Sequence, residues 1–169
     1  MPKIIENVRE QLLEVAKKQV AERGYGKTTI RSVAGECGLA VGTVYNYFKS
    51  KDMLIASFMA EDWKACLKEM EEGPRDDARG FIFNIYSSLC TYSEKHSALF
   101  SDADAAKVFS AVFSRRHKQL RDQIAELILP ICGADDFLSR FIAESLICWT
   151  MAGEKFDDIY RVIEKLIKQ

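Results

Sequence analysis

Apolar residues recur every three or four positions along almost all of the 169-residue sequence, and this periodicity restricts the possible fold more than any other feature. The pattern stops at residues that end helices, above all at the Gly73-Pro74 pair and at Pro130. No segment alternates apolar and polar residues as a half-buried strand would, and the sequence has no internal repeat. The sequence therefore predicts an all-α fold of about nine helices.

Residues 28–51 have the pattern of two short helices joined by a tight turn. The first helix has one apolar face, which includes Val33. Gly38 is expected to end this helix, because glycine adopts the left-handed conformation of a helix end without steric cost. Val44 and Phe48 lie four residues apart on one face of the second helix and can pack against the first. This arrangement is typical of a helix-turn-helix, whose second helix enters the major groove of DNA.

The residues left on the outside of the second helix suit contacts with DNA. They are Val41, Gly42, Thr43, Tyr45, Asn46 and Tyr47. Small residues at the start of the helix let the backbone approach base edges, and Thr43 offers them a methyl group and a hydroxyl. Tyr45, Tyr47 and Lys51 add donors for phosphate oxygens. The alternative is an ordinary helical hairpin with half-buried tyrosines and solvated lysines.

The same segment resembles the tetracycline-repressor (TetR) family of bacterial transcription regulators. The similarity includes TTIR at residues 28–31, GTVYNYF at residues 42–48 and SKD at residues 50–52, and it is specific over residues 5–60. It implies a three-helix DNA-binding head followed by a helical bundle. It also implies DNA contacts, and the full predicted DNA-binding set is Thr28, Thr29, Arg31, Val41, Gly42, Thr43, Tyr45, Asn46, Tyr47 and Lys51. One departure is Ala40, because a serine usually begins the recognition helix in this family.

Charge is distributed unevenly along the chain, although the net formal charge is only −1. Residues 1–51 contain nine Lys or Arg and five Asp or Glu, whereas residues 52–169 contain fifteen and twenty. A basic N-terminal part on an acidic remainder fits a DNA-binding head on a body that does not face DNA. We therefore expect a helix-turn-helix domain over residues 1–51 and an effector-binding and dimerisation domain over residues 52–169.

The last two predicted helices each have a wide apolar face. An antiparallel pair of such helices can dock on a second copy as a four-helix bundle, and the TetR resemblance implies a homodimer there. The predicted interface residues are Phe137, Phe141, Ser145, Trp149, Ile159, Ile163 and Leu166. A two-fold dimer places its recognition helices in successive major grooves roughly 35 Å apart, so double-stranded DNA with a palindromic operator is the expected partner. The alternative is that both faces are covered within one subunit.

The predicted body is rich in aromatic residues and methionine, a composition that can form an apolar cavity for a small-molecule effector. The candidate lining residues are Phe58, Met59, Trp63, Ile85, Tyr86, Leu89, Phe109, Phe113 and Trp149. An effector would lower the affinity for DNA by favouring a dimer geometry in which the recognition helices no longer match the groove spacing. Plain core packing is the alternative explanation for each of these residues.

Residues suited to catalysis or metal binding are few. The two histidines, His96 and His117, have no second histidine one helical turn away and no cysteine at a metal-ligand spacing. The sequence contains no phosphate-binding glycine motif and no nucleophile motif. We therefore expect no enzymatic activity, no cofactor and no metal ion. The basic run SRRHK at residues 114–118 is expected to be a solvated helix face, with contact to an acidic ligand or partner as the alternative.

The five cysteines, Cys37, Cys66, Cys90, Cys132 and Cys148, include no C-x-x-C pair and lie within apolar helical patterns. This placement indicates small core residues of a reduced protein, with a thiol-based redox sensor as the alternative. No stretch reaches the ~18 apolar residues of a membrane span, so we expect a cytoplasmic protein.

These patterns favour a homodimeric DNA-binding transcription regulator, a repressor released by an unidentified small molecule. Two alternatives remain open at this point: an all-helical protein-interaction module without specific DNA binding, and a thiol-responsive regulator.

Overall fold

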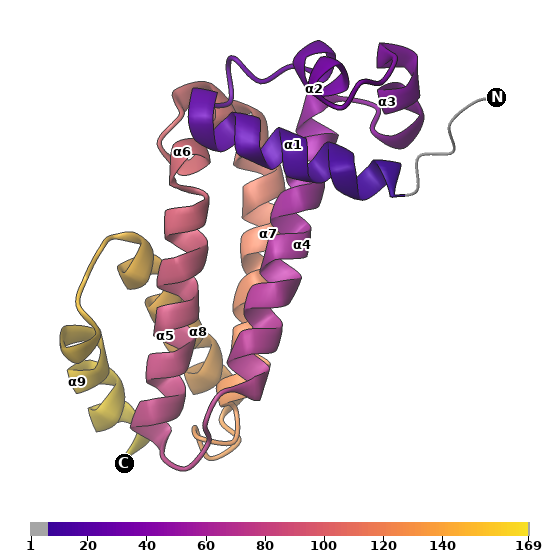
Figure 1. Cartoon of the computed structure of the whole chain (residues 1–169). Helices are drawn as coiled ribbons and strands as arrows, with labels where there is room; N and C mark the ends of the chain where they lie inside the picture. Colours follow the sequence, from indigo (N-terminus) through magenta and orange to yellow (C-terminus); the bar gives the residue numbers. More distant parts are fainter. Residues whose placement is uncertain (1–6, 169) are drawn as a thin grey trace. The chain divides into compact units, whose positions relative to one another are not determined.

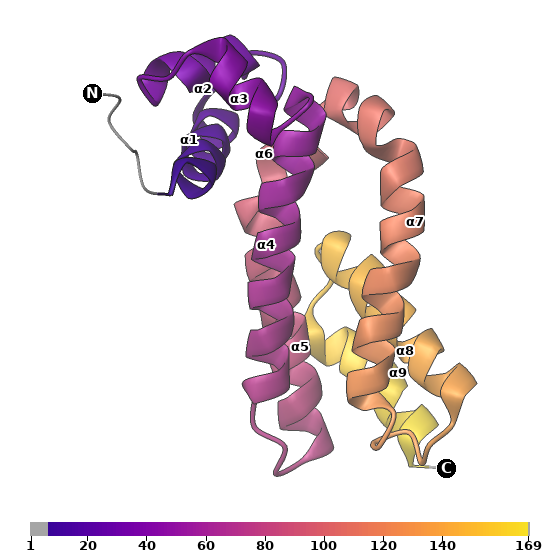
Figure 2. The same cartoon turned by 90° about the vertical axis from the view of Figure 1, so that its right-hand side faces the viewer.

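The computed structural model describes residues 7–168, apart from the side chains of residues 109–115. In that part of the chain the regular secondary structure consists of nine α-helices (Figures 1 and 2). They are α1 (Val8–Arg23), α2 (Ile30–Glu36), α3 (Val41–Tyr47), α4 (Lys51–Glu72), α5 (Ala78–Lys95), α6 (Ser97–Phe100), α7 (Ala103–Ile128), α8 (Asp136–Met151) and α9 (Phe156–Ile167). The all-α fold predicted from the sequence is confirmed.

Packing divides the described chain into two compact units. The N-terminal unit contains the described residues up to Trp63 together with Lys95–Phe109, and the C-terminal unit contains Lys64–Glu94 together with the described residues from Ser110 onwards. The domain boundary expected after residue 51 falls at the start of α4, a helix that contributes to both units. Each unit has buried apolar residues of its own.

In the N-terminal unit, α1 packs against α2 and α6, and α2 packs against α3 (Figure 1). The side chains that hold α1, α2 and α3 together are apolar and almost fully buried: Leu12, Leu13, Ala16, Val20, Val33, Ala34, Val44 and Phe48. The helices α2 and α3 meet at Gly38, whose φ of 66° lies in the left-handed region. Because a side chain at this φ would be strained, glycine permits the short turn, and the predicted helix-turn-helix is confirmed.

Polar side chains cap some helices of this structure and leave α3 uncapped. At the start of α4, the Met53 amide donates to Ser50 Oγ over 3.1 Å. At the start of α8, Asp135 Oδ1 accepts from the amides of Phe137 and Leu138, each over 2.9 Å. The N-cap of α3 is Ala40, which makes no side-chain hydrogen bond. The departure from the TetR sequence pattern therefore leaves the first turn of α3 without the hydroxyl that usually caps it.

In the C-terminal unit, α8 and α9 lie side by side (Figure 2). Sequence analysis found one apolar face on α8, and the structure shows two. The buried face consists of smaller residues, namely Ser139, Ile142, Ala143, Leu146, Ile147 and Thr150. The face with the large aromatic residues is the exposed one, with Phe137 73%, Phe141 49% and Trp149 53% exposed. The core of this unit therefore leaves the aromatic side of α8 uncovered in a single chain.

Candidate DNA interface

The helix α3 has one buried and one exposed face, as the sequence predicted. Val44 and Phe48 are buried, at 0% and 3% exposure, and fix the helix against its neighbours. On the other side, Val41, Tyr45 and Tyr47 are 36%, 46% and 47% exposed. Gly42 and Asn46 are also exposed and Thr43 is half-buried, so the six residues expected on the outside all reach solvent. This face offers one methyl-bearing hydroxyl, two phenols and one amide.

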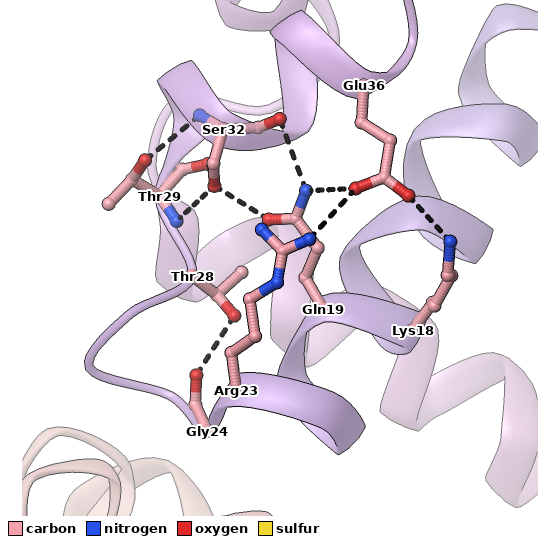
Figure 3. Close-up of polar contacts among 8 residues, drawn as sticks. All are labelled: Lys18, Gln19, Arg23, Gly24, Thr28, Thr29, Ser32 and Glu36. Carbon is pink, nitrogen blue, oxygen red and sulfur yellow. Dashed lines mark hydrogen bonds and ion pairs between the residues drawn. The ribbon is translucent and has the colours of Figure 1, made fainter.

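The start of α2 is fixed by reciprocal hydrogen bonds between Thr29 and Ser32 (Figure 3). The Ser32 amide donates to Thr29 Oγ1 and the Thr29 amide donates to Ser32 Oγ, each over 3.0 Å. Such a capping box satisfies two backbone donors that the first helical turn leaves without partners. Thr29 is nevertheless exposed, and Arg31 in the first turn of α2 is exposed as well. Thr29 and Arg31 are therefore both accessible to a molecule that binds this surface.

A buried glutamine connects α2 to α1 (Figure 3). The Ser32 hydroxyl donates to Gln19 Oε1 over 2.6 Å, and Gln19 Nε2 donates to the Ser32 carbonyl over 3.2 Å and to Glu36 Oε2 over 2.7 Å. Lys18 lies 2.9 Å from the other oxygen of Glu36. Hydrogen bonds from Lys18 and Gln19 lower the pKa of Glu36. Gln19 is only 1% exposed whereas Lys18 and Glu36 reach solvent, so a buried amide at the centre of this network fixes the orientation of α2 on α1.

Thr28 has a structural role in this fold and does not lie on the exposed surface predicted for it. Its side chain is fully buried, and its hydroxyl donates to the carbonyl of Gly24 over 3.0 Å (Figure 3). Contact between this side chain and DNA would require the turn after α1 to open. We therefore exclude Thr28 from the candidate interface, which keeps the other nine predicted residues.

Lys51 lies at the first position of α4 and is held by Tyr25. Its ammonium donates to the Tyr25 carbonyl over 3.0 Å and lies 3.6 Å from the centre of the Tyr25 ring. The Tyr25 hydroxyl in turn donates to Asp52 over 2.6 Å, and burial together with this carboxylate raises the pKa of Tyr25. An ammonium group has three donors, so the bond to Tyr25 leaves donors for a phosphate oxygen. Lys51 is therefore positioned in advance rather than freely mobile.

The predicted effector-pocket residues are distributed over both units. Phe58, Met59 and Trp63 are buried in the N-terminal unit, while Ile85 and Leu89 are buried and Tyr86 is half-buried in the C-terminal unit. Trp149 lies on the exposed side of α8. The side chains of Phe109 and Phe113 lie outside those that the structure describes. Core packing alone explains the burial of these residues. The effector pocket therefore remains a prediction.

Six of the seven predicted dimer-interface residues line one groove between α8 and α9. The groove has a volume of about 470 Å³, and its lining includes Phe141, Ser145, Trp149, Ile159, Ile163 and Leu166. The seventh, Phe137, lies on the same helix as the first three and is the most exposed of the large apolar residues reported in the described chain. Val162 adds a further apolar side chain to the groove and is 58% exposed.

One group of candidate metal-binding side chains could not be predicted from the sequence. His117 of α7 and Glu144 and Cys148 of α8 have ligand atoms that all lie within 4.8 Å of one another. His117 precedes Glu144 by 27 residues, so no local spacing pointed to their contact. Only the separation of Glu144 and Cys148 by one helical turn was visible in the sequence. Among the helices described, none is long and apolar enough to cross a bilayer.

Comparison with known proteins agrees with this architecture. Residues 12–58 match the profile of the family described as bacterial regulatory proteins, tetR family. A fatty acid metabolism regulator protein from Bacillus subtilis (strain 168) is 29% identical over 119 residues, which cover 70% of this chain and 59% of that protein. The chain therefore spans less than two thirds of the length of this curated relative.

Two solved structures share the fold. The crystal structure of a transcriptional regulator from Rhodococcus sp. Rha1 has a TM-score of 0.65 at 16% identity and covers 95% of this chain and 94% of that one. Thermus thermophilus FadR, a TetR family transcriptional repressor in complex with lauroyl-CoA, has a TM-score of 0.58 at 18% identity and covers 95% and 93%. Residues 12–58, which contain the helix-turn-helix of α2 and α3, are therefore similar to the tetR family of bacterial regulatory proteins, and the fold is shared with the two solved structures.

Proposed function

We propose that this protein is a sequence-specific DNA-binding transcription regulator that acts as a homodimer on a palindromic operator. We further propose that it is a repressor released by a small-molecule effector. The observation that supports DNA binding most directly is the exposed face of α3, where hydroxyl and amide groups stand on a helix whose other face is buried. A regulator of bacterial genes acts where the chromosome lies, so we place the protein in the cytoplasm.

The residues of the candidate interface divide into two roles. Thr43 lies near the N-terminal end of α3, the part of a recognition helix that contacts base edges in the major groove. Its neighbour Gly42 has open space where a side chain would stand, which permits close approach of the backbone to DNA. Lys51 and Arg31 carry positive charge and suit phosphate oxygens, which fix the register of the protein without selecting a sequence.

The groove between α8 and α9 supports the homodimer. It combines exposed aromatic and aliphatic side chains, notably Phe141, Trp149 and Val162, within one face of two adjacent helices. A helix pair that exposes such a face can form a four-helix bundle with a second copy. In such a two-fold dimer, the groove residues of one copy pack against the same residues of the other copy, which is the usual geometry of a homodimer.

For the effector, two of the three proteins named above suggest which ligands to test first. One is named as a regulator of fatty acid metabolism, and the other binds lauroyl-CoA. We therefore propose acyl-CoA thioesters, with lauroyl-CoA among them, as the first class to screen. Release requires that the ligand binds the DNA-free geometry more tightly than the DNA-bound one, because equal affinity for both would shift nothing.

Selection of bound duplexes from a random DNA pool tests the DNA-binding proposal. We expect the full chain to enrich an approximate palindrome at moderate salt, and we expect Tyr45→Ala and Lys51→Ala each to recover less bound DNA than the wild type. Lys64→Ala is the matched control, since Lys64 is an exposed lysine of α4 in the C-terminal unit. A folded, dimeric protein that enriches no sequence would contradict the proposal and favour a protein-interaction module.

The dependence of binding on salt distinguishes a DNA-binding surface from a protein-binding one. Affinity for DNA falls steeply as salt rises because binding releases counterions from phosphates, whereas an apolar protein interface responds weakly. Loss of one phosphate contact in Lys51→Ala should weaken binding to all sequences alike and reduce the slope of log affinity against log salt by about 1.

A further inference from the structure

Three donor groups of different chemistry meet between α7 and α8 in the C-terminal unit. His117 Nε2 lies 2.7 Å from Glu144 Oε1, and the Cys148 thiol donates to the same oxygen over 3.3 Å. The imidazole, carboxylate and thiol atoms all lie within 4.8 Å of one another. His117 and Glu144 are half-buried and Cys148 is exposed. None of these three side chains takes part in the proposed DNA interface or lines the groove between α8 and α9.

We propose that His117, Glu144 and Cys148 form a binding site for a single Zn²⁺ ion. The set of one imidazole nitrogen, one carboxylate oxygen and one thiolate sulfur consists of ligands that Zn²⁺ takes in proteins. Ca²⁺ and Mg²⁺ instead require oxygen ligands, of which this group offers one carboxylate. Zn²⁺ is usually four-coordinate, and because Cys148 faces solvent, water can occupy the fourth position.

Two of the three donor separations lie within about 1 Å of those in a tetrahedral site, and the third, between the imidazole nitrogen and the sulfur, is at most 4.8 Å. Ligands bound to Zn²⁺ at their usual distances lie about 3.5 Å from one another. The oxygen and sulfur are already 3.3 Å apart, while the nitrogen and oxygen, at 2.7 Å, must separate by less than about 1 Å. The ion replaces the two hydrogen bonds that now join the three groups. The thiol proton passes to solvent, and the sulfur binds as a thiolate. The proton on His117 Nε2 also leaves, so that the neutral imidazole binds through Nε2 with its proton on Nδ1.

Helical geometry holds two of the three donors in place. Glu144 and Cys148 are one turn apart on α8 and therefore point from the same side of one rigid helix. His117 approaches from α7 at the position needed to complete the site. Arg121 opposes a cation here, because its guanidinium lies 4.0 Å from Glu144 Oε2. Its charge is shared with Asp122, which it contacts over 2.7 Å, so the repulsion is reduced.

Titration of the reduced full chain with Co²⁺, a spectroscopic substitute for Zn²⁺, tests the site. We expect one equivalent of Co²⁺ to produce a thiolate-to-metal charge-transfer band and the absorption of a tetrahedral ion, and one equivalent of Zn²⁺ to remove both. We expect each of three variants to weaken Zn²⁺ binding at least about tenfold: His117→Ala, Glu144→Gln and Cys148→Ser. Loss of a group that only hydrogen-bonds to a metal ligand already costs about that much, and loss of a ligand itself should cost no less. Cys148→Ser should also abolish the charge-transfer band.

Cys90→Ser is the matched control, since it removes a half-buried thiol of α5 that does not belong to the group. It should bind Zn²⁺ as the wild type does. Circular dichroism identifies any variant that fails to fold, and the wild-type spectra decide the question independently of the variants. The proposal is overturned if folded wild-type protein gives no charge-transfer band, or if the band persists in Cys148→Ser. It is also overturned if folded His117→Ala and Glu144→Gln bind as tightly as the wild type.

Discussion

The recognition helix α3 and the α8–α9 pair distribute their apolar side chains in opposite ways. In α3, the apolar residues Val44 and Phe48 are buried, and the exposed face is small or polar apart from the tyrosine rings and Val41. In the α8–α9 pair the core face is filled, yet Trp149 and Val162 are more than half exposed. A face with hydroxyl groups suits a hydrated, charged partner, whereas an exposed apolar face suits a second protein surface.

The two regions differ in whether a single chain buries their apolar side chains. The helix-turn-helix buries its own apolar side chains and caps the start of α2 with its own side chains, so that it needs a partner only for function. The α8–α9 face leaves apolar area in water, and association removes that cost. Substitutions in the two regions should therefore affect different quantities: stability and DNA specificity in the first, and oligomeric state in the second.

The largest expected effect is that of a charge in the buried face of α3. Val44→Asp places a carboxylate at a fully buried position and should lower the free energy of unfolding by more than about 4 kcal/mol. Tyr45→Asp, at the next residue, is exposed and should change it by less than about 0.5 kcal/mol. Denaturant unfolding followed by circular dichroism measures both. Similar losses at the two positions would mean that α3 has no buried face.

A pH dependence of stability should arise in the N-terminal unit at His96. The side chain is 2% exposed, its Nε2 lies 3.1 Å from Asp62 Oδ2, and Lys17 and Lys95 bind the other oxygen of Asp62. Burial lowers the pKa of His96 to about 4, and Lys95 and Lys17 add to this effect while Asp62 opposes it. Burial would raise the pKa of Asp62, but hydrogen bonds from the two lysines outweigh it and lower that pKa.

The direction of the pH dependence is set by whether the folded or the unfolded chain binds the proton of His96 more tightly. Because the pKa of an unfolded histidine is about 6.5, the unfolded chain takes up this proton first as the pH falls. The free energy of unfolding should therefore decrease from pH 6.5 to pH 4, by up to about 3 kcal/mol. The effect of Asp62 has the same direction but lies at lower pH. His96→Gln should flatten the profile between pH 6.5 and 4, and an unchanged slope in this variant would exclude His96 as its source.

For the α8–α9 face, Trp149→Ala should weaken the dimer by at least about 2 kcal/mol, roughly thirtyfold in the dissociation constant, as expected for a central aromatic residue. Sedimentation equilibrium measures this change. Met53→Ala is the control, because Met53 is also about half exposed, at 52%, but belongs to α4 in the N-terminal unit. Equal dissociation constants for the wild type and Trp149→Ala would place the interface elsewhere.

The smallest expected effect concerns the missing cap of α3. Ala40→Ser introduces a hydroxyl that can accept from a backbone amide of the first turn, and it should raise the free energy of unfolding by about 1 kcal/mol. Thermal unfolding of the two proteins measures the difference. Leu39→Ser, one residue earlier, cannot serve as an N-cap and should give no such gain. A destabilised Ala40→Ser protein would show that the hydroxyl does not reach those amides.

Much of the fold could be predicted because its signals are local. The turn at Gly38 and the burial of Val44 and Phe48 depend on residues a few positions apart. The burial of Thr28 could not be predicted in this way, because a threonine between polar residues resembles a surface residue until its bond to Gly24 is known. The choice between two apolar faces of α8 likewise depends on which helices pack against it.

The grouping of His117 with Glu144 and Cys148 shows the same limit more strongly. The histidine lies on a different helix, and its basic neighbours in the sequence indicate a solvated face. Only tertiary packing brings its imidazole against α8. A metal site with ligands at short spacing would have been visible in the sequence, whereas this one depends on the relative position of α7 and α8.

The central claim is that the exposed face of α3 selects a DNA sequence. The most direct test measures the affinity of the wild type and Thr43→Ala for the selected palindrome and for each single base-pair substitution in its half-sites. We predict that Thr43→Ala loses discrimination at one symmetric position, by about 1–3 kcal/mol, and keeps it at the others. If Thr43→Ala instead weakens binding to the palindrome, its substituted forms and random DNA by the same factor, then Thr43 does not contact a base and the claim fails.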